Sequence, residues 1–177
     1  MDRRLLAAAY DRSAEGYDAR FRELQRVKFR AGAKLLRPPR EGALCVDAGG
    51  GTGLFIEWAR DEAPRLAAAR WLVLDRSLGM LRIARSRTPL VAVADLSRLP
   101  LRAAGLICAF TSLLDEVPAR LRELGRALET GGQLIASFLA AEAPEAAEIA
   151  SASGLQLEAG PLPAGQDRLF VLKRKAP

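Results

Sequence analysis

Five apolar runs alternate with helix-like segments between residues 43 and 138, and this alternation constrains the fold more than any other feature. The runs are five or six residues long, at 43–47, 71–75, 91–95, 106–110 and 133–138. Strands that alternate with helices are typical of βαβ units, which build a parallel sheet covered on both faces. Two further runs, 155–158 and 168–173, flank a Gly/Pro-rich loop near the C-terminus. The sequence therefore predicts an α/β fold: a Rossmann-like, doubly wound, seven-stranded and mostly parallel sheet with a C-terminal antiparallel hairpin.

The segments between these runs have the apolar spacing of amphipathic helices. In the first of them, apolar residues recur every three or four positions, at Phe21, Leu24, Val27, Ala31 and Leu35. Two prolines follow, and proline cannot continue a helix. We therefore expect the following helices: 18–37, 54 to about 62, one through residues 80–84, one from about 118 to the glycines at 131–132, and 144–153.

The chain of 177 residues has the length and composition of one globular domain. We expect a single domain over residues 1–177, with an N-terminal helical lid segment at 1–40 and a Rossmann-like core at 41–177. No apolar stretch approaches the roughly 20 residues that cross a bilayer. We therefore expect no membrane span and a cytoplasmic location.

The formal net charge of +6 resides entirely in the N-terminal segment. Residues 1–40 hold eleven basic and five acidic side chains, whereas residues 41–177 hold sixteen of each. Two interpretations remain open: a solvated helix face in a protein from a composition-biased genome, or a basic surface that binds an anionic partner.

The chain has no histidine, which excludes a Ser-His-Asp triad, a histidine proton shuttle and any histidine-ligated metal. Cys45 and Cys108 lie far apart in apolar runs, so we expect both to be buried and reduced, and we expect no metal site. Whatever reaction the protein catalyses must therefore need little acid or base catalysis, or must draw it from a carboxylate, a tyrosine or the substrate itself.

Four glycines occupy five positions, 49–53, directly behind the first predicted strand. Such a cluster marks a turn with positive φ or a place where the backbone approaches a ligand closely. In a doubly wound sheet, ligands bind outside the carboxyl ends of the strands, and the amide groups that begin the next helix favour anionic or polar groups there. Asp75 ends the second strand, where a carboxylate can accept hydrogen bonds from both ribose hydroxyls. The sequence thus predicts a nucleoside-containing ligand.

The glycine spacing distinguishes between cofactors. Neither Gly49 nor Gly51 starts a G-x-G-x-x-G dinucleotide fingerprint, and no Gly-Lys-Ser/Thr of a P-loop follows. The pattern that is present is Asp47-x-Gly49-x-Gly51-x-Gly53. In this pattern, and in three later segments that follow in order, the chain resembles the class I S-adenosylmethionine-dependent methyltransferases. Within that class it is similar to the ubiquinone and menaquinone biosynthesis group, type 11. The resemblance implies S-adenosyl-L-methionine as the cofactor and methyl transfer as the activity.

The resemblance also implies roles for individual residues. The first motif, whose glycines contact the methionine part of the cofactor, covers Asp47, Ala48, Gly49, Gly50, Gly51 and Gly53. In the second segment Asp75 would bind the ribose hydroxyls, while Arg76 and Met80 would flank the adenine. In the third, the side chain of Asp95 and the amide of Leu96 would bind the adenine edge.

Two aromatic residues complete the expected cofactor site. The resemblance implies that Tyr17, in an N-terminal signature that also includes Tyr10, lies over the cofactor, although tyrosines of an N-terminal helix are more often packing residues. Phe110, at the end of the fourth strand, would face the crevice mouth. The N-terminal segment is expected to fold over the carboxyl ends of the strands and close the site.

Only the absence of certain motifs restricts the class of methyl acceptor. Residues 108–112 lack the Asn/Asp-Pro-Pro-aromatic motif of exocyclic-amine methyltransferases, and Cys108 lacks the flanking proline of a cytosine-5 nucleophile. We favour a small acceptor, such as a quinone-like ring or a carboxylate, over RNA or protein bound by the basic segment. A catalytically silent partner subunit is a third hypothesis, and a homodimer is possible. We predict no catalytic residue, because attack on a sulfonium methyl depends mainly on positioning and exclusion of water.

Overall fold

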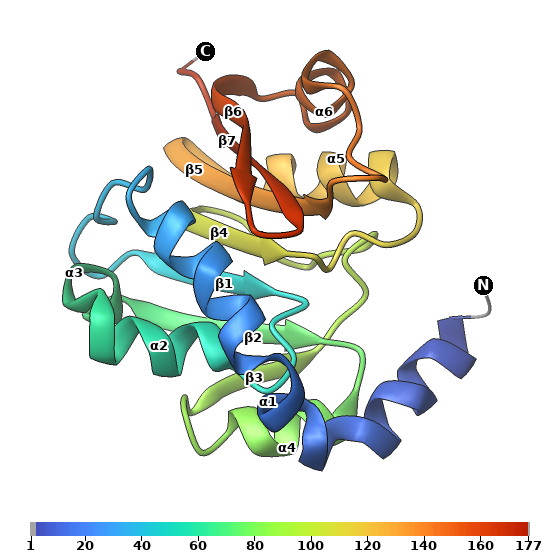
Figure 1. The fold of residues 1–177 in the computed structure, drawn as a ribbon. Coiled ribbons are helices and arrows are strands. Elements are labelled where there is room, and N and C mark those ends of the chain that lie inside the picture. Colours follow the sequence, from blue (N-terminus) through green and yellow to red (C-terminus); the bar gives the residue numbers. More distant parts are fainter. Residues whose placement is uncertain (1–2, 177) are drawn as a thin grey trace.

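The computed structural model describes residues 3–176, in which seven strands form one mixed sheet (Figure 1). The strand order is β3-β2-β1-β4-β5-β7-β6, and the first five strands are parallel while β7 is antiparallel to both of its neighbours. The predicted fold class is confirmed. The strands are β1 Leu44–Ala48, β2 Arg70–Asp75, β3 Leu90–Val93, β4 Ala104–Phe110, β5 Leu128–Leu139, β6 Gln156–Ala164 and β7 Asp167–Lys173.

Helices cover both faces of the sheet, as expected when βαβ units alternate. They are α1 Arg3–Ala33, α2 Leu54–Glu62, α3 Pro64–Ala67, α4 Leu78–Ala84, α5 Val117–Ala127 and α6 Ala146–Ser153. Helices α1, α2 and α3 lie on one face, and α5 and α6 lie on the other (Figure 1). Helix α1 changes direction partway along, so that its N-terminal part extends beyond the sheet (Figure 1).

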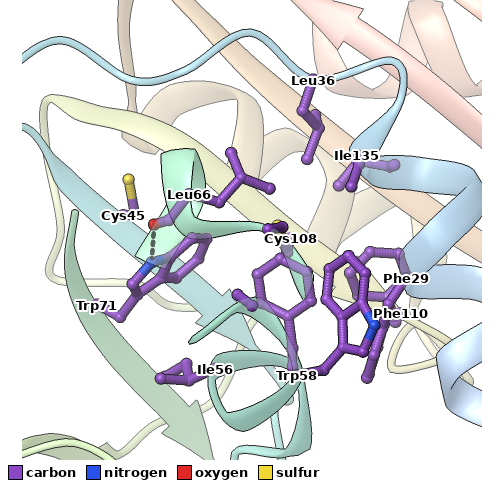
Figure 2. Close-up of a cluster of buried hydrophobic side chains, with 14 of the residues drawn as sticks. Phe29, Leu36, Cys45, Ile56, Trp58, Leu66, Trp71, Cys108, Phe110 and Ile135 are labelled. Atoms are coloured by element: carbon purple, nitrogen blue, oxygen red, sulfur yellow. Dashed lines mark hydrogen bonds between the residues drawn. The ribbon is translucent and has the colours of Figure 1, made fainter. Parts of the chain in front are cut away.

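Alternate residues of each strand supply two hydrophobic cores, one under each helical layer. In β4, Leu106 and Cys108 pack toward α1 and α2, while Ile107 and Ala109 pack toward α5. The first core contains an aromatic group in which Phe29 of α1 lies 5.0 Å from Phe110 and 5.6 Å from Trp58 between ring centroids (Figure 2). These contacts dock α1 firmly on the sheet. Both cysteines are buried and free, as predicted.

Several predicted boundaries are wrong, each for a local reason. Helix α1 spans Arg3–Ala33 instead of 18–37, and it ends before the prolines because three-residue turns close it, with Leu35 N donating to Gly32 O. Helix α5 ends at Ala127, since Leu128 is extended and already pairs with β4. Strand β3 ends at Val93, which leaves Asp95 outside the sheet.

The Gly/Pro-rich segment predicted as a loop before the last strand belongs to β6 itself. Strand β6 lies at one edge of the sheet, and an edge strand tolerates prolines because its outer N–H groups need no partner. The prediction of a hairpin holds, but its first strand extends to Ala164.

The buried face of α1 also differs from the predicted apolar face. Val27 is 45% exposed, whereas the polar residues Gln25 and Lys28 are buried. The C-terminal half of the helix holds both residues, and it packs partly against polar groups at the end of β4 and the start of β7, where Lys28 Nζ contacts Thr111 Oγ1 and Asp167 Oδ2. Although α1 is 31 residues long, none of the helices in residues 3–176 has an apolar stretch that would span a membrane.

Candidate functional site

A cavity opens at the carboxyl ends of the central strands, beside the point where the strand order reverses between β1 and β4. It contains about 740 Å³ of empty space, part of it open to solvent, which is within the usual range for small-ligand sites. Its lining comes from α1, the glycine loop, the end of β2, α4, the segment after β3, the end of β4 with the segment that follows it, and α5. The lining residues are Ala7, Tyr10, Tyr17, Gly49, Gly51, Asp75, Arg76, Ser77, Met80, Ala94, Leu96, Phe110, Thr111, Ser112, Leu114 and Arg120.

The glycine loop adopts the left-handed conformation that glycine favours, with φ of 70°, 56° and 78° at Gly49, Gly51 and Gly53. A Cβ atom at Gly49 would lie 2.3 Å from Ser112 Cβ, so the loop packs tightly against the segment after β4. A Cβ atom at Gly51 would meet only Met80 Sδ, at 3.9 Å. Gly51 therefore leaves open space at the wall of the cavity, where a ligand can approach the backbone.

Asp75 connects the end of β2 to the glycine loop. Its Oδ2 accepts a hydrogen bond from Gly51 N at 2.9 Å, and its Oδ1 accepts one from Ser77 N at 2.8 Å. A carboxylate has about four lone-pair sites, so it can accept further hydrogen bonds from a ligand in the cavity. Burial raises the pKa of Asp75, and the backbone hydrogen bonds oppose this shift.

Asp47 lies beneath the loop and lines a second, smaller cavity that shares Tyr17, Gly49 and Phe110 with the first. The side chain is 3% exposed, and its Oδ2 has no hydrogen-bond partner. Burial, followed by the charge of Asp75, raises the pKa of Asp47 to about 7. A buried carboxylate oxygen without a donor is costly, so this atom is suited to a positively charged ligand group.

Arg76 and Asp95 form an ion pair with 2.6 Å between Arg76 Nη2 and Asp95 Oδ1. The same oxygen accepts hydrogen bonds from Ser97 N and Ser97 Oγ. Burial raises the pKa of Asp95, but these hydrogen bonds outweigh it, so the net shift is downward. Arg76 and Leu96 line the cavity, whereas Asp95 does not. In the structure, Asp95 holds Arg76 and caps the turn that follows β3.

Helix α1 forms one wall of the cavity through Tyr10 and Tyr17, whose rings meet edge to face with centroids 6.5 Å apart. Asp11 fastens this part of the helix to α4, because its Oδ1 accepts hydrogen bonds from Ser77 Oγ and from Gly79 N. Further along α1, Asp18 forms an ion pair with Arg87, which follows α4, and accepts a hydrogen bond from Thr52 Oγ1 in the glycine loop. Polar contacts therefore hold α1 over the site.

Of the predicted site residues, most line one of the two cavities: Asp47, Gly49, Gly50, Gly51, Asp75, Arg76, Met80, Leu96, Phe110 and Tyr17. Ala48 and Gly53 line neither: Ala48 O accepts a hydrogen bond from Ser112 Oγ, and Gly53 is the N-cap of α2. Sequence reasoning missed Ser77, Thr111, Ser112 and Arg120. A polar pair directly after a buried strand, Thr111–Ser112, was a usable signal, but nothing in the sequence distinguished Arg120 from other helical arginines.

Comparison with known proteins agrees with this geometry. The family model described as "Methyltransferase domain" matches residues 46–136. The malonyl-[acyl-carrier protein] O-methyltransferase of Gallionella capsiferriformans is 33% identical over 155 residues, and that of Serratia marcescens is 34% identical over 149. These alignments cover 78% and 80% of this chain and 52% and 55% of the relatives, so the chain spans about half the length of the curated relatives it matches.

Among solved structures, a TehB-like S-adenosylmethionine-dependent methyltransferase from Corynebacterium glutamicum has a similar fold. The TM-score is 0.69 with 22% sequence identity, over 92% of this chain and 98% of that one. At this level of sequence identity, the similarity shows a shared fold and nothing further.

The sheet, the glycine loop behind β1 and the acidic residue that ends β2 define the class I Rossmann-like methyltransferases. The chain belongs to the methyltransferase domain family of type 11, whose cofactor is S-adenosyl-L-methionine.

The residues of the site fit this cofactor. Asp47 offers a buried carboxylate oxygen without a donor, and Gly51 leaves room beside bare backbone. Asp75 is a second carboxylate at the cavity wall. Within residues 3–176, no group of three cysteine, aspartate or glutamate side chains is arranged to hold a metal ion.

Proposed function

We propose that this methyltransferase domain methylates a carboxylate oxygen of a small acyl acceptor, and that a malonyl-type thioester is its substrate. The observation that carries the proposal is the position of Arg120 in α5. Its guanidinium group is buried, with the residue 4% exposed, yet it lines the main cavity. A planar guanidinium group matches a carboxylate with two parallel hydrogen bonds, so it suits an acceptor that carries this group.

Two contacts position Arg120 at the cavity wall. Its Nη1 donates to Ser112 O at 3.1 Å, and its Nη2 forms an ion pair with Asp115. Ser112 follows β4, donates a hydrogen bond to Ala48 O at the end of β1 and packs against Gly49, so the guanidinium group is fixed relative to the cofactor site. Arg120 would hold and orient the acceptor carboxylate.

The residues of the site are consistent with a reaction that needs no enzymic base. When bound, S-adenosyl-L-methionine supplies a methyl group whose transfer to a carboxylate oxygen leaves S-adenosylhomocysteine and a methyl ester. A carboxylate is already ionised at neutral pH, so the absence of histidine is no obstacle. Tyr10, Tyr17 and Phe110 would exclude water from the cavity, and exclusion of water together with orientation accounts for most of the expected acceleration.

The alternative, an acceptor in RNA or protein bound by the basic N-terminal segment, has less support. Several basic side chains in that segment pair with acidic residues of the core. The pairs are Arg22–Glu57, Arg26–Glu62, Lys28–Asp167, Arg30–Glu62, Arg37–Glu158 and Arg40–Glu129. This distribution favours an intramolecular role for the charge, which holds the segment against the core.

The relatives named above act, by their names, on a malonyl-[acyl-carrier protein]. The test is methyl incorporation into malonyl-acyl-carrier protein from radiolabelled S-adenosyl-L-methionine, with acetyl-acyl-carrier protein as the acceptor that lacks the free carboxylate. We expect label only in the malonyl form, as a base-labile methyl ester. Arg120→Met should abolish turnover while cofactor binding remains, and Arg122→Met, an exposed arginine on the same helix, should have little effect. Equal labelling of both acceptors, or full activity of Arg120→Met, would contradict the proposal.

A further inference from the structure

Two residues that line the smaller cavity each have a buried side-chain oxygen atom without a hydrogen-bond donor. These atoms are Oε1 of Gln25 in α1 and Oδ2 of Asp47 at the end of β1. The residues are 9% and 3% exposed. Buried acceptors without donors are rare because each loses its hydration without compensation. Their occurrence together on one cavity indicates that a ligand supplies the donors.

The orientation of Gln25 defines which of its atoms is available. Its Nε2 donates to the hydroxyl oxygen of Tyr17 at 3.4 Å, which leaves Oε1 as the amide atom without a partner. Gln25 belongs to the face of α1 that packs against the sheet, next to Lys28 and Phe29. The amide therefore reaches the site from the helix, while Asp47 reaches it from the strand below.

The remaining walls of the cavity restrict the ligand group further. The apolar side chains are Phe29, Leu54, Phe55 and Phe110, and Gly49 and Gly50 contribute backbone. Tyr17 adds a hydroxyl group that already accepts the hydrogen bond from Gln25 Nε2. A mainly apolar enclosure whose unpaired polar atoms are one carboxylate and one amide oxygen favours a compact cation with several N–H donors. An ammonium group has three donors and no acceptor. In the cofactor of this family, the α-ammonium of the methionine part is such a group.

We propose that Gln25 is a cofactor-binding residue, whose amide oxygen accepts a hydrogen bond from the α-ammonium group of the methionine part while Asp47 provides the countercharge. The inference rests on the cofactor assignment and makes α1 part of the cofactor site as well as its cover. It is independent of the identity of the methyl acceptor.

Calorimetric titration with three ligands tests the inference. S-adenosylhomocysteine has both the ammonium and the carboxylate, its decarboxylated analogue has only the ammonium, and 5′-methylthioadenosine has neither. Gln25→Met keeps the length of the side chain without polar atoms, and Gln25→Glu keeps an acceptor oxygen. Glu23→Met changes an exposed residue of the same helix and serves as the control. Thermal denaturation establishes that each variant is folded.

We expect Gln25→Met to lower the affinity for S-adenosylhomocysteine and for its decarboxylated analogue by roughly tenfold to a hundredfold. Its affinity for 5′-methylthioadenosine should remain that of the wild type, and Gln25→Glu should retain binding of both ammonium ligands. Equal losses for all three ligands would overturn the inference, because they would indicate general disruption of α1. A loss confined to S-adenosylhomocysteine would also overturn it, since it would assign Gln25 to the carboxylate. If the wild-type protein bound none of the three, the cofactor assignment itself would fail.

Discussion

Lys28 and Asp167 form a buried ion pair between α1 and the sheet, with 3.3 Å between Lys28 Nζ and Asp167 Oδ2 and side chains only 3% and 1% exposed. Thr111 Oγ1 accepts a hydrogen bond from Lys28 Nζ and donates one to Asp167 Oδ2, and Ser137 Oγ donates to the same carboxylate oxygen. Thr111 has a φ of 52°, which is unusual for a β-branched residue. The ion pair therefore joins the helix that covers the site to the strained residue at the cavity wall.

Loss of the lysine charge should destabilise the protein more than loss of both charges. Lys28→Met leaves the carboxylate of Asp167 buried without a countercharge, and breaking one side of a buried pair costs about 3–5 kcal/mol. The double variant Lys28→Met/Asp167→Asn removes both charges and should cost less. Urea denaturation measures the free energy of unfolding of each. Lys34→Met, at an exposed lysine beyond the end of α1, is the control and should change it by less than about 0.5 kcal/mol. A double variant as unstable as the single one would contradict this account.

The ion pair shows where prediction from the sequence reached its limit. Spacing of apolar residues selected Phe21, Leu24 and Val27 as the buried face of α1, but the helix buries Gln25 and Lys28 and exposes Val27. Periodicity assumes that a helix packs on an apolar surface. It cannot identify a polar surface formed by the ends of strands that are distant in sequence, such as β4 and β7.

The strands and the glycine loop were predictable for the opposite reason. Each strand is a short local run of apolar residues between turn residues, and the loop needs glycine because its φ angles are positive. Asp75 followed from its place at the end of a predicted strand. Asp95 was expected at the cofactor but lies outside the cavity lining, because its neighbours Arg76 and Ser97 engage its side chain. Arg120 could not be predicted, since its burial depends on how α5 packs.

Gly49 and Gly51, the two loop glycines that line the main cavity, should respond differently to the same substitution. A Cβ atom at Gly49 would collide with Ser112, whereas one at Gly51 would have free space and only the cost of a left-handed alanine, about 1–2 kcal/mol. We expect Gly51→Ala to remain folded and to lose cofactor affinity, because the methyl group stands where the ligand approaches the backbone. Gly49→Ala should lower the melting temperature by more. Thermal denaturation and titration with S-adenosylhomocysteine separate the two effects, and normal binding by Gly51→Ala would show that Gly51 is a turn residue only.

Removal of the Asp75 carboxylate should both weaken cofactor binding and destabilise the glycine loop. The side chain accepts hydrogen bonds from Gly51 N and Ser77 N, and it lines the cavity. Asp75→Ala should cost about 2–3 kcal/mol of binding free energy for S-adenosylhomocysteine, the value of charge-assisted hydrogen bonds. Asp75→Asn keeps one acceptor oxygen and should lose less of this binding free energy. Calorimetry measures both, and an unchanged affinity in Asp75→Ala would exclude a ribose contact.

The buried carboxylate of Asp47 should make cofactor binding depend on pH near neutrality. Burial and the charge of Asp75 raise its pKa to about 7 in the ligand-free protein. The neighbouring Tyr17 and Cys108 remain neutral in this range, because burial raises the pKa of each. An ammonium ligand requires the ionised carboxylate, so affinity should fall as the pH is lowered from 8 to 6, by up to about tenfold per pH unit below the pKa. Binding should also release protons below pH 7, which calorimetry in buffers of different ionisation enthalpy detects.

The same shift sets the sign of a stability change. Asp47 is ionised in the unfolded chain above its ordinary pKa of 3.8 but stays protonated in the folded protein up to about pH 7. Its contribution to the stability of the ligand-free protein is therefore lost as the pH rises from about 4 to about 7. Asp47→Asn should raise the melting temperature of the ligand-free protein at pH 8. It should also weaken the binding of S-adenosylhomocysteine and remove the pH dependence of that binding. A wild-type affinity that is constant from pH 6 to 8 would show that Asp47 does not pair with the cofactor.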